Sequence, residues 1–156
     1  SIANDIGLNV DFNGTVSNEK YMAYLKKLDF NDLCVFGNTI TGEQKDNKLK
    51  KAKFVILPSL NEGMPLVILE SLSYGTPVIC FDIGYISEYL GEDYLGLVSE
   101  LSDKAMKDRI EYLNSLSIND YLKLRKQSYD IFWSKFDPLN INQKVINIFK
   151  QKKSRI

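Results

Sequence analysis

The chain contains 156 residues, of which 44% are hydrophobic, 12% aromatic and 26% charged, which is typical of one globular domain. Twenty Lys and Arg residues balance twenty Asp and Glu residues, and the lack of a basic excess argues against a nucleic-acid partner. Uninterrupted apolar runs reach only about six residues, as in Met64–Leu69, so the sequence predicts no membrane-spanning helix.

Histidine is absent from the sequence. This excludes Ser-His-Asp and Cys-His catalytic arrangements and removes the commonest metal ligand. The two cysteines, Cys34 and Cys80, each lie within an apolar run and form no CxxC motif, so a zinc site is not expected. We predict that both are buried, reduced thiols of a cytosolic protein.

Short apolar runs alternate with helical patterns up to about residue 100, and their Val, Ile, Leu and Phe content suits strands covered on both faces. This alternation favours βαβ units, so we predict an α/β, Rossmann-like, mostly parallel sheet of about five strands flanked by helices. The predicted strands are Leu8–Phe12, Leu33–Phe36, Phe54–Leu57, Val78–Phe81 and Leu95–Val98.

Helical patterns fall between these strands and then occupy the whole C-terminal part of the chain. Asp137-Pro138 marks the last break between helices, because proline disfavours helix at the residue before it. The basic end, Lys150 to Arg155, is interpreted as a solvated helix end, with a contact to anionic lipid as the alternative. The predicted helices are Asn18–Leu28, Gln44–Lys51, Pro65–Tyr74, 103–115, 118–134 and 138–150.

The segment from Phe54 to Glu88 carries the features expected of a binding site. A strand leads through a short loop into a helix that Pro65 opens at its first position, and Gly75 ends that helix. No Ser, Thr or Asp caps this helix start, so the amides of Leu66 and Val67 are available to an anion. Gly63 has no side chain, so a ligand can approach its backbone closely.

Two glutamates accompany this helix. Glu70 is the only charged residue of a helix that is apolar nearly all round, so we expect it to be buried and to hold a ligand such as a vicinal diol. Glu62 precedes the helix and would project into the same cleft. The alternatives are structural: Glu62 could cap the helix, and Glu70 could pair with a Lys or Tyr of the core.

These residues resemble the donor-binding half of a retaining family 4 glycosyltransferase with the GT-B fold. Such enzymes carry a strand, Pro-Ser, E-G-F-G, an apolar run ending in Glu, and A-x-G-x-P-V. Weaker matches extend the resemblance over roughly residues 30–100. The corresponding residues here are Pro58-Ser59, Glu62-Gly63-Met64-Pro65, Glu70 and Tyr74-Gly75-Thr76-Pro77-Val78, with Val35-Phe36-Gly37, Ala52-Lys53-Phe54, Asp82-Ile83-Gly84-Tyr85-Ile86-Ser87-Glu88 and Gly96-Leu97-Val98 on either side.

The resemblance implies a role for each residue of the segment. Glu62 would contact hydroxyls of the transferred sugar, with no role assigned as nucleophile or general base. The backbone of Gly63, Met64, Pro65, Leu66 and Val67 would hold the sugar and the diphosphate. Glu70 would hold the ribose diol of the nucleotide, and the turn at Asn38 and Thr39 would border the base. The family needs no metal, so no cofactor is expected beyond the nucleotide-diphosphate sugar, linked to UDP or GDP.

Three departures from the family pattern stand out. Pro65 replaces the second glycine of the first motif, and Tyr85 replaces a glycine, which would narrow the sugar pocket. The strand ending in G-R-x-x-x-x-K-G, which would clamp the diphosphate, has no counterpart. We therefore expect a single donor-binding domain over residues 1–156, incomplete at its N-terminus and without the acceptor domain. Without that central strand, the strands at 8–12 and 54–57 must pair directly, or another chain must fill the gap.

The resemblance implies sugar transfer to a glycan or lipid-linked acceptor in envelope polysaccharide synthesis, such as lipopolysaccharide or capsule. The expected location is the cytoplasm, with peripheral contact at the inner face of the cell membrane. The piece alone is expected to be inactive. The alternatives are a non-catalytic flavodoxin-like or receiver-like module and a GT-B epimerase. A receiver-like module needs a cluster of acidic residues at its strand ends, and this chain has Asp82 but no matching set. A GT-B epimerase generally uses histidine, which this chain does not contain.

Overall fold

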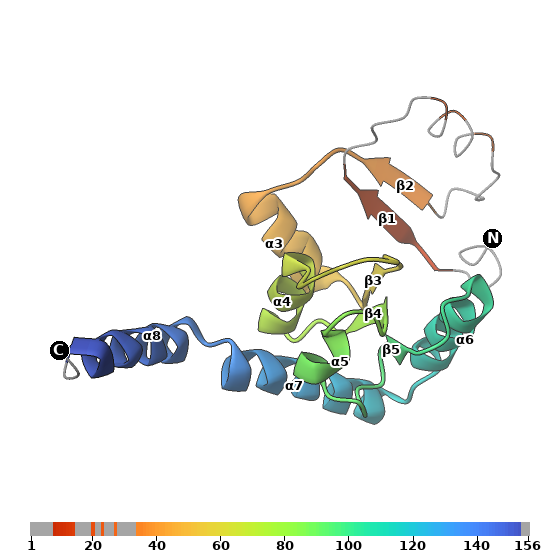
Figure 1. The fold of residues 1–156 in the computed structure, drawn as a ribbon. Coiled ribbons are helices and arrows are strands. Elements are labelled where there is room, and N and C mark those ends of the chain that lie inside the picture. Colours follow the sequence, from red (N-terminus) through yellow and green to blue (C-terminus); the bar gives the residue numbers. More distant parts are fainter. Residues whose placement is uncertain (1–7, 15–19, 21–22, 24–26, 28–33, 154–156) are drawn as a thin grey trace. The chain divides into compact units, whose positions relative to one another are not determined.

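The computed structural model describes residues 8–14, 20, 23, 27 and 34–153. The chain divides into two compact units, Ser1–Lys48 and Leu49–Ile156 (Figure 1). The predicted helix Asn18–Leu28 falls largely on residues outside the described part. Among the described residues, no helix is long and apolar enough to cross a membrane.

The first unit contains a pair of parallel strands, β1 (Val10–Asn13) and β2 (Cys34–Gly37). Both strands were predicted, with bounds shifted by one or two residues. Cys34 is half-buried, so the prediction that it is a buried core thiol is wrong. In the described residues β2 pairs only with β1, which leaves its other edge unpaired in the sheet. Helix α3 (Gly42–Lys51) follows and runs across the division between the units.

The second unit is built on three parallel strands in the order β3-β4-β5, namely β3 (Val55–Leu57), β4 (Val78–Phe81) and β5 (Leu97–Val98). All four residues of β4 are buried, Cys80 included, as expected of a central parallel strand. The α/β class with parallel strands is therefore confirmed. The helices of this unit are α4 (Leu66–Ser73), α5 (Ile86–Leu90), α6 (Asp103–Asn114), α7 (Ile118–Lys135) and α8 (Pro138–Lys153).

The described strands pair in two sets, one within each unit: β1 with β2, and β3 with β4 and β4 with β5. Direct pairing of β1 with β3, one of the two solutions proposed above, stays a prediction. Two strands followed by three is the order left when the central strand of a 3-2-1-4-5-6 sheet is taken out.

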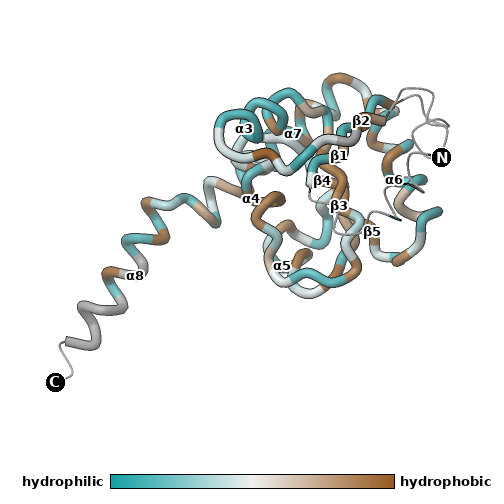
Figure 2. Tube along the Cα trace, turned by 90° about the horizontal axis from the view of Figure 1, so that it is seen from above, coloured by the Kyte–Doolittle hydropathy of each residue, from teal (hydrophilic) through white to brown (hydrophobic). Residues whose placement is uncertain are grey.

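The helices of the second unit cover β4 with apolar side chains. Helix α4 packs against β4 and α7, and α6 packs against β4 and β5. Figure 2 shows the apolar colour of α4, in which only Glu70 is charged. The sequence analysis missed α5, because its five residues are too few to show a helical period.

A chain of hydrogen bonds joins β4 to α7 inside this core. The amide of Val78 donates to the Tyr94 hydroxyl (3.1 Å), which lies 2.9 Å from the Ser128 hydroxyl. Ser128 donates in turn to the carbonyl of Leu124 (2.9 Å). Burial raises the pKa of Tyr94 to about 12, so the phenol stays protonated and remains a donor at neutral pH.

Candidate nucleotide-sugar site

The two ends of α4 have different chemistry. At its C-terminus the helix ends in a Schellman motif, in which Gly75 donates to Leu72 (2.8 Å) and Thr76 donates to Ser71 (2.9 Å). Gly75 has φ +66°, a conformation that glycine adopts without strain, so the predicted stop is confirmed.

The start of α4 has no side-chain cap. Pro65 is the N-cap residue rather than the first helical residue, because its ψ of 119° is extended. Its carbonyl accepts from the amide of Ile68 (3.0 Å), which leaves the amides of Leu66 and Val67 ahead of the first hydrogen-bonded turn. Leu66 is 70% exposed, so this turn reaches the surface, contrary to the expectation of a helix buried all round.

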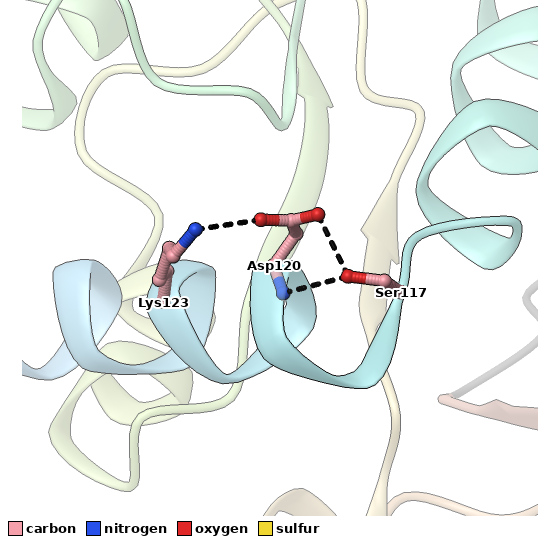
Figure 3. Close-up of polar contacts among 3 residues, drawn as sticks. All are labelled: Ser117, Asp120 and Lys123. Carbon is pink, nitrogen blue, oxygen red and sulfur yellow. Dashed lines mark hydrogen bonds and ion pairs between the residues drawn. The ribbon is translucent and has the colours of Figure 1, made fainter.

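Helices α6 and α7 begin differently. Ser102 caps α6 by accepting from the amide of Ala105 (3.1 Å). At the start of α7, the Ser117 hydroxyl accepts from the Asp120 amide and donates to the Asp120 carboxylate, which also binds Lys123 (Figure 3). These bonds, that to Lys123 above all, lower the pKa of Asp120. Unlike α6 and α7, α4 has no side chain that accepts from the amides of its first turn.

The loop from β3 to α4 places Glu62 next to the loop that follows β4. A Cβ built on Gly84 would lie 2.7 Å from the carbonyl oxygen of Glu62, so the two loops touch backbone to backbone. Both loops leave the carboxyl edge of the three-stranded sheet, where ligands of open α/β sheets bind. Glu62 is half-buried, whereas Gly63 and Met64 are exposed.

Glu70 lies one turn into α4 from Leu66, on the same side of the helix. It is half-buried, so the expectation of a buried carboxylate is wrong. The buried residues of α4 are Ile68, Ser71 and Leu72, whereas Glu70 lies on the side of the helix that carries the exposed Leu66. Glu62, the start of α4 and Glu70 thus all lie in the second unit, on α4 and on the loop that leads into it.

Asn38 and Thr39 follow β2 in the first unit and are both exposed. Their contact with the base stays a prediction. Tyr85, expected to narrow the sugar pocket, is 67% exposed as the N-cap residue of α5.

Tyr89 on α5 was not found by sequence analysis. The ring of Tyr89 is only 7% exposed, and its hydroxyl has no hydrogen-bond partner among the described residues. Burial raises the pKa of Tyr89 to about 12, with further contributions from Cys80 and the charge of Glu62. Burial and the neighbouring charge of Asp82 likewise raise the pKa of Cys80 to about 12. No sequence signal distinguishes this tyrosine from the eight others.

No group of three or more His, Cys, Asp or Glu side chains in the described ranges could hold a metal ion. Two surface hollows of about 410 and 390 Å³ lie along α7, and none of the predicted site residues lines them.

An α/β fold with an uncapped helix start at the carboxyl edge of a parallel sheet is an arrangement that can bind a phosphate group. The family comparison makes this specific. The family model for glycosyl transferases group 1 matches residues 3–130, and the chain belongs to this family. The match favours a glycosyltransferase over the receiver-like and epimerase alternatives.

Curated relatives include the "Putative teichuronic acid biosynthesis glycosyltransferase TuaC" of Bacillus subtilis, 33% identical over 78 residues. A UDP-Gal:alpha-D-GlcNAc-diphosphoundecaprenol alpha-1,3-galactosyltransferase of Escherichia coli is 42% identical over 57 residues. The sulfoquinovosyl transferase SQD2 of Arabidopsis thaliana is 32% identical over 76 residues. These matches cover 47%, 36% and 49% of this chain, and 20%, 15% and 15% of the respective relatives.

Solved structures share the fold. Sucrose-phosphate synthase from Thermosynechococcus elongatus superposes with a TM-score of 0.81 at 17% identity, covering 99% of this chain and 42% of that one. TarM superposes with a TM-score of 0.67 at 19% identity, covering 95% and 30%. The chain therefore spans less than half the length of either protein.

Proposed function

We propose that this chain is the donor-binding part of a retaining glycosyltransferase that takes a nucleotide-diphosphate sugar and works without a metal. In this proposal residues 1–156 form one donor-binding domain that lacks its first strand. The acceptor binds to a domain outside the chain, so the chain alone transfers no sugar. The retaining outcome and the metal independence rest on the resemblance to family 4 enzymes.

The uncapped start of α4 beside Glu62 is the observation that carries the proposal. The amides of Leu66 and Val67 would donate to the diphosphate, and the helix dipole would add about 0.3–1 kcal/mol at an exposed site. Gly63 and Met64, both exposed, would let the sugar and the diphosphate approach the backbone.

The two glutamates would divide the remaining recognition between them. Glu70 would accept hydrogen bonds from both ribose hydroxyls, each worth about 1.5–3 kcal/mol as a charge-assisted bond. Glu62 would accept from hydroxyls of the transferred sugar. Asn38 and Thr39 would border the base.

Catalysis in the whole enzyme would depend mainly on electrostatic stabilisation. Negative charge develops on the β-phosphate as the sugar leaves, and preorganised donors lower the energy of that state. The amides at the start of α4 are such donors, and they need no reorganisation during the reaction. No side chain is assigned as nucleophile or general base.

Envelope polysaccharide synthesis is the setting we propose, in the cytoplasm at the inner face of the membrane. The names of two relatives support it, one naming teichuronic acid biosynthesis and the other a diphosphoundecaprenol-linked acceptor. The second name also contains UDP-Gal, which supports UDP as one of the two nucleotides to test.

The test is a titration of the chain with UDP and with GDP, in which binding is measured by ligand-observed NMR. We expect one of the two nucleotides to bind. Glu70→Ala should lower the affinity for that nucleotide by about tenfold or more, because charge-assisted hydrogen bonds to the ribose are lost. Glu92→Ala, an exposed glutamate after α5, is the matched control and should bind as the wild type does. Binding of neither nucleotide contradicts the proposal, and equal binding by Glu70→Ala contradicts the role of Glu70.

A further inference from the structure

The Tyr89 hydroxyl is the one buried side-chain oxygen or nitrogen without a hydrogen-bond partner in the described part of the chain. The side chain is 7% exposed, so it is more than nine-tenths buried. Buried hydroxyls in proteins nearly always have a partner, because an unpaired one has lost its bonds to water without replacement. An unpaired phenol beside a candidate binding site therefore calls for a functional explanation.

The ring of Tyr89 is held in place from α7 and its C-cap. Phe136 packs against it edge to face, with ring centroids 5.9 Å apart. The Lys135 ammonium group donates to the Tyr89 carbonyl at 2.9 Å, which fixes the backbone of α5. These two contacts hold the ring and the backbone of Tyr89 against α7 and its C-cap.

The backbone of Glu62 lies beside the loop that leads into α5, which makes the Glu62 carboxylate the candidate acceptor. Helix α5 begins directly after the loop that contains Gly84, and this loop touches the backbone of Glu62. Burial is the main cause of the raised pKa of Tyr89, and the charges of Cys80 and then Glu62 add to it, in keeping with a Glu62 carboxylate on this side of α5. A phenol that stays protonated at neutral pH is a hydrogen-bond donor, and its bond to an anionic acceptor is stronger than one to a neutral acceptor.

We propose that Tyr89 is a positioning residue, whose hydroxyl donates a hydrogen bond to the Glu62 carboxylate in the donor-bound protein. A carboxylate has about four lone-pair sites. One bond from Tyr89 would hold its orientation and leave the others for hydroxyls of the sugar. The inference rests on the proposed role of Glu62 as the residue that contacts the sugar.

The variant Tyr89→Phe tests this, because it removes only the hydroxyl. UDP-glucose and GDP-mannose serve as nucleotide-sugar probes, and UDP and GDP as probes without the sugar, all by calorimetry. We expect Tyr89→Phe to lower the affinity for the nucleotide sugar by about tenfold and to leave the affinity for the matching nucleotide unchanged. Tyr112→Phe, a half-exposed tyrosine on α6, is the control and should change neither.

The double variant Tyr89→Phe with Glu62→Gln separates positioning from a structural role. If Tyr89 acts through Glu62, the double variant binds the nucleotide sugar no more weakly than Glu62→Gln alone. The inference would be overturned if the losses of binding free energy in the two single variants add in the double variant. An equal loss of affinity for the nucleotide and for the nucleotide sugar would overturn it too. Nucleotide-sugar binding at wild-type strength by Tyr89→Phe would overturn it as well.

A measurement without ligand keeps the inference separate from the proposed function. In the chain labelled with ¹³C in its tyrosine rings, Tyr89→Phe assigns the Tyr89 signal. We expect Glu62→Gln to shift this signal more than Glu92→Gln does, although Glu92 is nearer in the sequence. If the wild type binds no nucleotide sugar but this shift is present, the proposed function fails, while Tyr89 and Glu62 are shown to be neighbours. If the shift is absent, the two side chains are not neighbours and the inference fails.

Discussion

Gly84 lies so close to Glu62 that a Cβ added to it would be 2.7 Å from the Glu62 carbonyl oxygen. Gly84 also has φ +57°, a backbone conformation that residues other than glycine adopt only at a cost in free energy. The loop after β4 thus supports the loop that carries Glu62, and it does so only because residue 84 has no side chain.

Gly84→Ala should therefore displace the Glu62 loop. We expect a loss of about 1–3 kcal/mol in the free energy of unfolding from the strained backbone and the close contact, and weaker nucleotide-sugar binding. Urea denaturation and calorimetry measure the two effects. Gly14→Ala is the matched control, since nothing lies within 4 Å of its Cβ position. Equal stabilities for the two variants would contradict the supporting role of Gly84.

Tyr94→Phe should destabilise the second unit. The substitution removes the acceptor of the buried Val78 amide and one of the two partners of Ser128, whose hydroxyl still donates to Leu124. An unpaired buried group such as the Val78 amide costs about 1–3 kcal/mol. Fluorescence of Trp133, the single tryptophan, during urea unfolding reports on this unit. An unchanged midpoint would show that the hydrogen-bond chain contributes little.

Stability should fall at alkaline pH, from about pH 9 upward. The pKa of Cys80 rises from 9.0 to about 12, and those of Tyr89 and Tyr94 rise from 10.0 to about 12. The unfolded chain releases these protons first, so each group stabilises the fold below its unfolded pKa. That contribution disappears as the pH approaches 12, by about 1.4 kcal/mol per pH unit for each group.

Urea unfolding followed by far-UV circular dichroism at pH 8, 9.5 and 10.5 measures this decline. Cys80→Ala should remove most of the slope between pH 8 and 9.5, where the tyrosines of the unfolded chain are still largely protonated. A slope that persists in this variant would assign the decline to other groups.

Leu66→Glu should weaken nucleotide binding without harming the fold. Leu66 is 70% exposed at the start of α4, where a carboxylate would stabilise the helix dipole by about 0.3–1 kcal/mol. The same charge would repel a diphosphate. Leu66→Gln is the neutral control of similar size, and thermal unfolding with calorimetry distinguishes the two effects. Equal nucleotide affinity in both variants would argue against phosphate binding at this helix.

The sequence by itself determined the α/β class and the helix predicted at Pro65–Tyr74, which spans Leu66–Ser73 in the structure. These features depend on interactions between residues near each other in the chain. Alternation of apolar runs sets the strands, Gly75 supplies the positive φ that ends α4, and Pro65 precedes a helix with no side chain to cap it.

Only the tertiary structure decided that Tyr89 is buried without a partner, that Gly84 touches Glu62, and that Glu70 and Cys34 are half-buried. It also decided that β1 pairs with β2 and that β4 lies between β3 and β5. Each of these depends on which loops and strand edges meet in space. Residue type and spacing set local conformation, but burial and pairing depend on neighbours that are distant in the chain.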